Sequence, residues 1–542
     1  MAILYVKQNA TGNNNGSSWN NAYTDLQNAI AAASFNDEIW VAKGTYTPGT
    51  SRFDSFTLKN FVGIYGGFAG NETSRSQRNW ENNETILSGD IGTVSDNSDN
   101  SYNVVSTSNI TPTAILDGFT ISGGNSNGSI ISDGGGIYIS NGSPTLANLV
   151  ITDNSARDDG GGMFYQNSSP TLTNIKVTNN FAGDDGGGIF SYRSDGILSD
   201  VTFENNVADS GGGIVNWQSN LYLINGSFKF NAALSGVGGA IYNNSSDDLS
   251  ITNSLFQLNA STDVGGAIYN RGNSNDTTII NNSTFTGNIG RNGGAVYTTT
   301  ADTTINNSIL WNNQAIISGN EIDGTAATVS NSIVRGGYSG TGNIDVDPNF
   351  VNDANSNLRL NAGSPAIDAG DNSLIPTDDR DLDNDGDLTE QLPLDLDKNA
   401  RIVDGTVDMG AYEYSMPIAP GSTMGETGTI SNLTHTARTI NLSHTYQNPV
   451  IFAQPLSYNG AAPAAVRLSN IDSDSFTIQV QEPNNEDGSH AGENLSFMVL
   501  EAGTWELADG TLLQVGTTDS NQLVSQGWET VNFNADFDTN PV

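Results

Sequence analysis

The sequence predicts an all-β protein: a right-handed parallel β-helix with an N-terminal strand–helix–strand cap and a C-terminal antiparallel β-sandwich. Two motifs that share one period, and a change of composition after residue 416, predict this fold class. The first motif is a small-residue triplet followed by an apolar pair, and its copies lie at residues 134–138, 160–164, 186–190, 211–215, 238–242, 265–269 and 293–297. The second motif places Asn three positions after an apolar residue, and its copies end at Asn154, Asn180, Asn206, Asn231, Asn259, Asn288 and Asn313.

The period of 25 to 28 residues predicts a solenoid with one coil per repeat. The apolar segments are short, rich in Val, Ile and Phe, and broken by Gly, Asn, Asp and Ser, which is typical of strands. One coil cannot bury its own apolar face, but coils stacked about 4.8 Å apart pair every strand with its neighbours. Asn at one turn position is expected to form a side-chain ladder, and Phe is expected to stack on Phe. A leucine-rich-repeat horseshoe is the alternative, but its leucine spacing is absent.

The open end of a solenoid has to be covered. Residues 24–33 have helical spacing, with Asp25 placed as an N-cap, and strand-like residues flank them. We interpret this unit as a cap on the first coil. The predicted organisation begins with a cap and irregular coils at residues 1–110, followed by the β-helix at 111–345 and a closing module with an acidic insertion at 346–416. A linker at 417–422 leads to a lectin-like sandwich at 423–524, and the start of a second, truncated copy is predicted at 525–542.

Three strings outside the regular coils carry a resemblance. Residues 62–92 contain VGIYGGFAGNETS, Arg78, Trp80 and TILSGDI, and with the Gly-rich coils they resemble bacterial β-helix proteins with polymorphic-outer-membrane-protein-type repeats. Residues 347–372 and 406–414 resemble the closing module of bacterial surface β-helix proteins of the choice-of-anchor type. The resemblance implies a secreted or surface-displayed protein. It implies no reaction, because such folds serve adhesins, structural proteins and polysaccharide-active enzymes alike.

An acidic insertion, TDDRDLDNDGDLTE, interrupts the closing module at residues 377–390. Alternating carboxylates before a Gly are typical of loops that wrap oxygen ligands around Ca²⁺. The pattern departs from an EF-hand because Leu392 occupies the twelfth position and no helical periodicity flanks the loop. We expect a structural Ca²⁺ ion here, and a solvated acidic insertion is the alternative. The expected ligands are Asp381, Asp383, Asp385, Asp387 and Glu390.

The C-terminal region has alternating apolar and polar residues, which predict a small antiparallel sandwich. The strings TINLSHTYQNPVIFAQP, SFTIQVQE and SFMVLEAG resemble the H-type lectin pattern, which implies a six-stranded carbohydrate-binding sandwich. Residues 528–542 repeat residues 437–450 with one residue inserted. We therefore expect a second sandwich copy to begin here, in a longer protein with tandem modules.

Composition limits the partners. The chain has 19 Lys and Arg against 59 Asp and Glu, so its formal net charge is −40. This charge repels nucleic acid and anionic membranes, so neither nucleic-acid binding nor membrane insertion is expected. There is no Cys, which excludes disulfides and thiolate metal sites. The first residues do not resemble a signal peptide. We expect an extracellular or bacterial cell-surface location, reached without an N-terminal signal peptide or after removal of a leader.

Three functions stay open. The favoured one is a non-enzymatic adhesin or matrix protein that binds extracellular polysaccharide or cell-surface glycans. The second is a polysaccharide-modifying enzyme, because paired carboxylates in adjacent coils are what glycosidic cleavage requires. The third is a self-associating filament subunit. Repeated Asp-Asp before Gly is also a simple turn former, and we nominate no catalytic residue. The candidate ligand-binding residues are Asp158, Asp159, Asp184, Asp185 and Trp217.

Overall fold

The computed structural model describes residues 2–244, 248–272, 276–299, 302–324, 327–353, 357–378, 387–403, 405–414, 424–453, 456–457, 459, 463–482, 491–506 and 512–517. The chain divides into two compact units, Met1–Tyr414 and Ser415–Val542, which are described separately. The predicted linker at 417–422 and the predicted second sandwich copy at 525–542 lie outside the described residues.

The N-terminal segment forms a strand, a helix and a strand, as predicted. Strand β1 (Ile3–Val6) pairs in parallel with β2 (Glu38–Ala42). Helix α1 (Leu26–Ala32) follows Asp25, whose carboxylate accepts a 2.8 Å hydrogen bond from the Gln27 amide, so the predicted N-cap is confirmed. The apolar face of α1 belongs to the same buried core as the coils that follow. A short 3₁₀ turn, η1 (Arg75–Gln77), lies further along.

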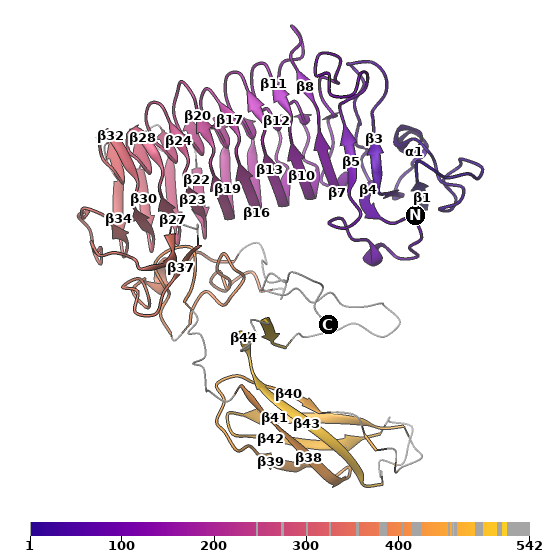
Figure 1. Cartoon of the computed structure of the whole chain (residues 1–542), viewed down its shortest axis with the longest axis vertical. Helices are drawn as coiled ribbons and strands as arrows, with labels where there is room; N and C mark the ends of the chain where they lie inside the picture. Colours follow the sequence, from indigo (N-terminus) through magenta and orange to yellow (C-terminus); the bar gives the residue numbers. More distant parts are fainter. Residues whose placement is uncertain are drawn as a thin grey trace. The chain divides into compact units, whose positions relative to one another are not determined.

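The rest of the first unit is a parallel β-helix of three sheets, which confirms the predicted solenoid (Figure 1). Besides β1 and β2, sheet A contains β3 (Gly44–Tyr46), β4 (Gly63–Phe68), β5 (Thr85–Ser88), β7 (Ile115–Ser122), β10 (Thr145–Thr152), β13 (Thr171–Thr178), β16 (Asp195–Glu204), β19 (Asn220–Lys229), β22 (Asp248–Thr252), β23 (Leu255–Gln257), β26 (Thr277–Asn281), β27 (Thr284–Thr286), β30 (Asp302–Asn306), β31 (Ile309–Trp311), β34 (Ala327–Ser330) and β35 (Ile333–Val334). Sheet B contains β6 (Val105–Ser108), β9 (Ile137–Ser140), β12 (Met163–Gln166), β15 (Ile189–Tyr192), β18 (Ile214–Trp217), β21 (Ile241–Asn244), β25 (Ile268–Arg271), β29 (Val296–Thr298) and β33 (Ile322–Gly324). Sheet C contains β8 (Asn125–Ser126), β11 (Ser155–Ala156), β14 (Phe181–Ala182), β17 (Val207–Ala208), β20 (Ala232–Ala233), β24 (Ala260–Ser261), β28 (Ile289–Asn292) and β32 (Gln314–Ser318).

The glycine triplets form the turn that leads into sheet B. The first Gly of each triplet has a left-handed backbone, as at Gly186, where φ is 69°. The second Gly is required by close approach of the next coil. A Cβ on Gly187 would lie 2.5 Å from the Val207 carbonyl oxygen and 2.6 Å from that of Gly212. Both requirements explain why the triplet recurs with the period of the coil.

The predicted asparagine ladder runs through the turn between sheets A and C. From Asn154 to Asn313, each Nδ2 donates to the Oδ1 of the equivalent Asn in the next coil at 2.8–3.1 Å. All of these side chains are buried. The predicted stacking of Phe is also present, with ring centroids 4.6–4.9 Å apart along Phe203, Phe228, Phe256 and Phe285.

The asparagine ladder ends at a carboxyl group. Asn313 Nδ2 donates to Glu321 Oε2 at 2.5 Å, so Glu321 takes the place that an Asn of a further coil would hold. Glu321 is 3% exposed, and its Oε1 has no hydrogen-bond partner among the described residues. Burial raises the pKa of this carboxyl group to about 7.

The segment after the last coil packs against sheet A. It contains the antiparallel strands β36 (Phe350–Asn352) and β37 (Asn357–Leu360) and the 3₁₀ turn η3 (Asn372–Leu374). Asn253 Nδ2 donates to the Leu394 carbonyl at 2.6 Å. Within this segment, Arg401 and Glu413 form an ion pair of 2.9 Å in which both side chains are 1% exposed. Burial is the largest influence on Glu413 and raises its pKa to about 8.

The second unit contains two three-stranded antiparallel sheets around one apolar core. One sheet has the order β38 (Gly425–Leu433), β43 (Glu493–Glu501) and β40 (Pro449–Ala453). The other has the order β39 (Arg438–Asn441), β42 (Ser475–Gln481) and β41 (Ala465–Asp472), and β44 (Gly503–Glu506) pairs with β45 (Leu512–Val515). The core contains Ile430, Phe476, Ile478, Val480 and Val499. The predicted antiparallel sandwich is confirmed.

Candidate carbohydrate-binding face

The Asp-Asp turns bring carboxyl groups into register beside sheet B. The Asp185 amide donates to Asp159 Oδ1 at 3.2 Å, and the Asp159 amide donates to Asp133 Oδ1 at 3.3 Å. These three side chains therefore form an inner acidic row, one per coil. Two of them, Asp159 and Asp185, were predicted from the sequence. Asp133 was missed because only one Asp precedes its glycine triplet.

The other member of each pair lies in an outer row. The Asp184 amide donates to the Asp158 carbonyl at 3.0 Å, so these residues also occupy equivalent places in adjacent coils. Arg157 pairs with Asp158 at 2.8 Å, whereas Asp184 is exposed. The four predicted aspartates thus lie on one edge of one face, in two rows.

The two rows differ in their electrostatics. Burial, with a smaller contribution from the charges of Asp185 and Asp133, raises the pKa of Asp159 to about 8. Burial also raises the pKa of Asp185 to about 6. By contrast, the hydrogen bond from Arg157 holds the pKa of Asp158 below its usual range. Near neutral pH, the structure therefore places a protonated carboxyl group next to an ionised one.

An aromatic row covers the outer face of sheet B beside the carboxyl groups. Tyr138, Phe164 and Phe190 stack with centroids 5.4 Å apart in each step, and Trp217 continues the row at 6.2 Å from Phe190. Their flat faces are largely used against one another. Tyr138, Tyr192, Trp217 and Tyr269 are only partly buried, so they present accessible aromatic surface on this face. The sequence signal for Tyr138, Phe164 and Phe190 was the second apolar position of the repeated motif, whereas Trp217 lies two positions after Val215, which holds that position in its coil.

Polar groups border the accessible aromatic residues. The Arg193 guanidinium lies 4.9 Å from the ring centroid of Tyr192, and its Nε donates to Gln218 Oε1 at 3.1 Å. Aromatic surface beside hydrogen-bonding groups suits a sugar, which has an apolar C–H face and a hydroxyl rim. The face bounded by the inner acidic row, the outer acidic row, Tyr192 and Trp217 is called the B face below.

The predicted calcium ligands fall in two classes. Asp381, Asp383 and Asp385 lie outside the described residues. Asp387 accepts hydrogen bonds from the Thr389 amide at 2.9 Å and its hydroxyl at 2.7 Å, and Glu390 is partly buried. Among the described residues, no group of three or more His, Asp or Glu side chains could hold a metal ion. The calcium site stays a prediction.

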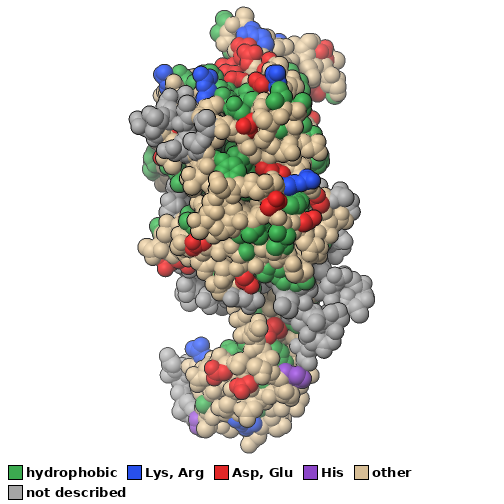
Figure 2. Space-filling view, turned by 90° about the vertical axis from the view of Figure 1, so that its left-hand side faces the viewer, with side chains coloured by type: hydrophobic (Ala, Val, Ile, Leu, Met, Phe, Trp, Pro, Cys, Tyr) green, Lys and Arg blue, Asp and Glu red, His purple; other side chains and the backbone are tan. Residues whose placement is uncertain are grey.

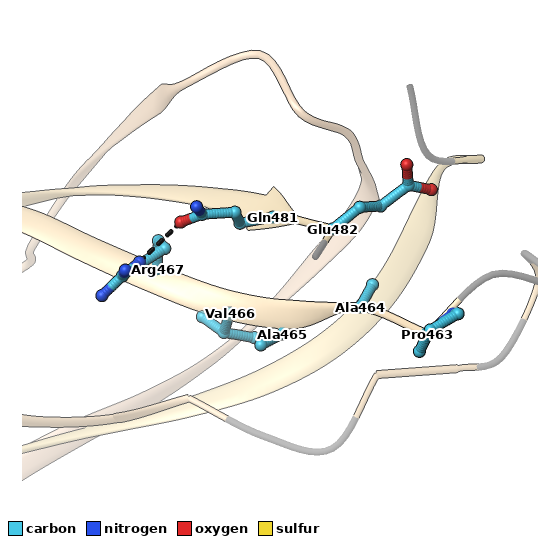
Figure 3. A pocket seen from close by; sticks show the side chains of 7 residues that line it. All are labelled: Pro463, Ala464, Ala465, Val466, Arg467, Gln481 and Glu482. Carbon is cyan, nitrogen blue, oxygen red and sulfur yellow. Dashed lines mark hydrogen bonds between the residues drawn. The ribbon is translucent and has the colours of Figure 1, made fainter. Parts of the chain in front are cut away.

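Two shallow hollows in the described part of the sandwich were not predicted from the sequence. One of about 750 Å³ lies on β38, β43 and β40, with Phe452 48% exposed and the hydroxyl-bearing side chains of Thr427, Thr429 and Ser496 beside it. The other, of about 420 Å³, lies on β41 and β42 (Figure 3). Arg467 Nε donates to Gln481 Oε1 there at 2.6 Å. Both volumes are in the range of small-molecule sites.

The surface in view in Figure 2 carries many carboxylates and few basic side chains, in keeping with the net charge. No helix in the described part of the chain has the length and apolar character needed to cross a membrane.

The repeats have known relatives. Residues 200–216 and 276–299 match the Chlamydia polymorphic membrane protein repeat. Halomucin of Haloquadratum walsbyi is 35% identical over 104 residues, which are 18% of this chain and 1% of that protein. The chain therefore spans a very small part of this curated relative.

Solved structures give distant similarities. Pectate lyase Pel9A aligns with a TM-score of 0.40 and 15% identity over 77% of this chain and 97% of that chain. The Dettilon tailspike protein aligns with a TM-score of 0.29 and 11% identity over 92% of this chain and 94% of that chain. The chain has a parallel β-helix in which residues 200–216 and 276–299 match the polymorphic membrane protein repeat, and this match suggests a surface protein.

Proposed function

We propose that this protein is displayed on a surface or secreted, and that it binds glycans through the B face as an adhesin or matrix protein. The observation that carries the proposal is that partly exposed aromatic rings lie along sheet B, while carboxyl groups repeat once per coil in the turn that leads into the same sheet. Coils about 4.8 Å apart offer equivalent groups at a spacing close to that of successive sugars in an extended β-linked chain. The acidic rows favour neutral or amino sugars over acidic ones.

A panel of neutral, amino-sugar and acidic polysaccharides tests the proposal, with the full chain as the probe. Trp217→Ala is expected to weaken binding of a ligand on the B face about tenfold, or about 1.4 kcal/mol. Phe181→Ala is the matched control, because Phe181 is an exposed aromatic residue on sheet C, away from the B face. Equal binding by the chain and the Trp217 variant would remove the B face from the proposal.

A polysaccharide-cleaving enzyme is the second candidate, and one observation favours it. Asp158 and Asp159 are neighbours whose pKa values are displaced in opposite directions, which is how an acid and a base are separated in an active site. The same panel tests this candidate when it is scored for released products. Product release that is lost in Asp159→Asn would establish the enzyme. Binding of a polysaccharide without release of products would favour the adhesin over the enzyme.

The predicted Ca²⁺ ion would serve this protein as a structural ion in the acidic insertion. The support is the sequence pattern alone, since alternating carboxylates before a Gly are suited to oxygen ligation of Ca²⁺.

A further inference from the structure

The C-terminal unit has very few positive charges. Residues 415–542 contain no Lys and two Arg, Arg438 and Arg467. Arg438 is used internally, because its Nη1 donates to the Ser431 carbonyl at 3.1 Å and its Nη2 donates to the Asn432 carbonyl at 2.9 Å. Arg467 is the other arginine, and it lies in the hollow on β41 and β42.

One hydrogen bond orients the Arg467 side chain and leaves its two Nη groups available to a ligand. Its Nε donates to Gln481 Oε1 across the strand pair, which fixes the direction of the guanidinium group (Figure 3). Neither Nη atom has a hydrogen-bond or ion-pair partner in the described part of this unit. A guanidinium held through Nε presents its two Nη groups as a fork, the geometry that binds a carboxylate or a sulfate with two parallel hydrogen bonds.

The rest of the hollow suits a sugar ring. Pro463 and Ala465 line it with exposed side chains, beside Ala464 and Val466, which also pack against the core of the sandwich, so it offers a small apolar surface to the C–H face of a pyranose. Glu482 also lines the hollow, and its carboxylate points away from Arg467 (Figure 3). A cation and an apolar wall therefore meet in a volume of about 420 Å³.

We infer that this hollow binds an acidic sugar, with the carboxylate or sulfate of the sugar on the open fork of Arg467. The inference rests on the proposed glycan binding, but it concerns a different site and a different class of glycan. The B face carries two rows of carboxyl groups and disfavours acidic glycans, whereas Arg467 favours them. The protein would then bind two chemically different glycans at two separate places.

Binding of the full chain to two pairs of polymers tests the inference. Hyaluronan against neutral cello-oligosaccharides probes the carboxylate, and dextran sulfate against dextran probes the sulfate. Arg467→Gln is expected to raise the Kd for the acidic polymer at least tenfold. Arg467→Lys, which keeps the charge but loses the fork, is expected to have an intermediate effect. Arg438→Gln is the matched control and should bind as the parent chain does, provided that the thermal melts of the variants agree.

Preference for either acidic polymer, reduced by Arg467→Gln and by added salt, supports the inference, and the polymer that binds identifies the anion. Equal binding of acidic and neutral polymers, or acidic binding that survives Arg467→Gln, overturns it. The Trp217→Ala variant separates this result from the proposed function. If its binding to neutral glycans falls while Arg467 has no effect, the proposed function stands and only the inference fails.

Discussion

The asparagine ladder allows a quantitative prediction for Asn231→Ala. The Asn231 side chain accepts from the Asn206 amide at 3.1 Å and from Asn206 Nδ2 at 3.0 Å. It also donates to the Phe203 carbonyl at 2.9 Å and to Asn259 Oδ1 at 3.0 Å. Removal of this side chain leaves two buried N–H groups of Asn206 without an acceptor and takes a donor from Phe203. At roughly 1–3 kcal/mol for each of these three groups, the expected loss of stability is about 3–9 kcal/mol.

Urea unfolding and native-state hydrogen exchange measure this loss. Exchange should accelerate most in the coils that contain Asn206, Asn231 and Asn259, because a solenoid couples each coil mainly to its neighbours. The matched control is Asn220→Ala. The half-exposed Asn220 side chain donates to Asp195 and accepts from the Asp248 amide, each at 2.8 Å, and because water can replace both bonds the expected cost is about 1 kcal/mol or less. Equal losses in the two variants would show that the buried ladder does not hold the coils together.

In thermal melts, Gly187→Ala should destabilise the chain by about 3 kcal/mol or more, because the added Cβ would lie 2.5–2.6 Å from two carbonyl oxygens. Gly516→Ala is the control and should not change stability, because the space around Gly516 is open. Glu321→Gln should remove a pH dependence of stability. Because the pKa of Glu321 is about 7 in the folded chain and 4.5 when unperturbed, the free energy of unfolding of the parent should fall by about 3 kcal/mol as pH rises from about 4.5 to about 7. The variant should not show this fall, so a stability difference between parent and variant that stays constant over this pH range would refute the reasoning. Calcium at a hundredfold excess over its Kd should stabilise the chain by about 2.7 kcal/mol in differential scanning fluorimetry, and Asp383→Asn should abolish the gain, while an unchanged melt with chelator would remove the calcium site.

The solenoid could be predicted because its physical requirements repeat in the sequence. Each coil needs a Gly where the next coil comes close, and an Asn where polar backbone groups of the turn are buried. The same residue types therefore recur every 25 to 28 residues. Asp25 was also predictable, since an N-cap is a local feature. The end of the ladder could not be predicted. Glu321 occupies a Gly or Ala position of the motif, and its role depends on its hydrogen bond with Asn313, which lies in another turn.

The candidate site was predicted only in part. The Asp-Asp pairs are visible as repeats, but Asp133 belongs to the inner row through stacking and not through its own sequence context. The divergent pKa values of Asp158 and Asp159 depend on burial and on Arg157, neither of which a repeat pattern reveals. Arg467 has no motif around it. Its importance arises from strand pairing, which places Gln481 beside it and leaves its fork open.

Oxidative footprinting of the full chain, with and without a glycan that it binds, shows whether the glycan lies on the B face. Bound glycan is expected to protect Trp217 and Tyr192 from oxidation, while Phe181 on sheet C stays as reactive as in the free protein. Unchanged oxidation of Trp217 and Tyr192 at saturating glycan would contradict the assignment of the B face as the binding site.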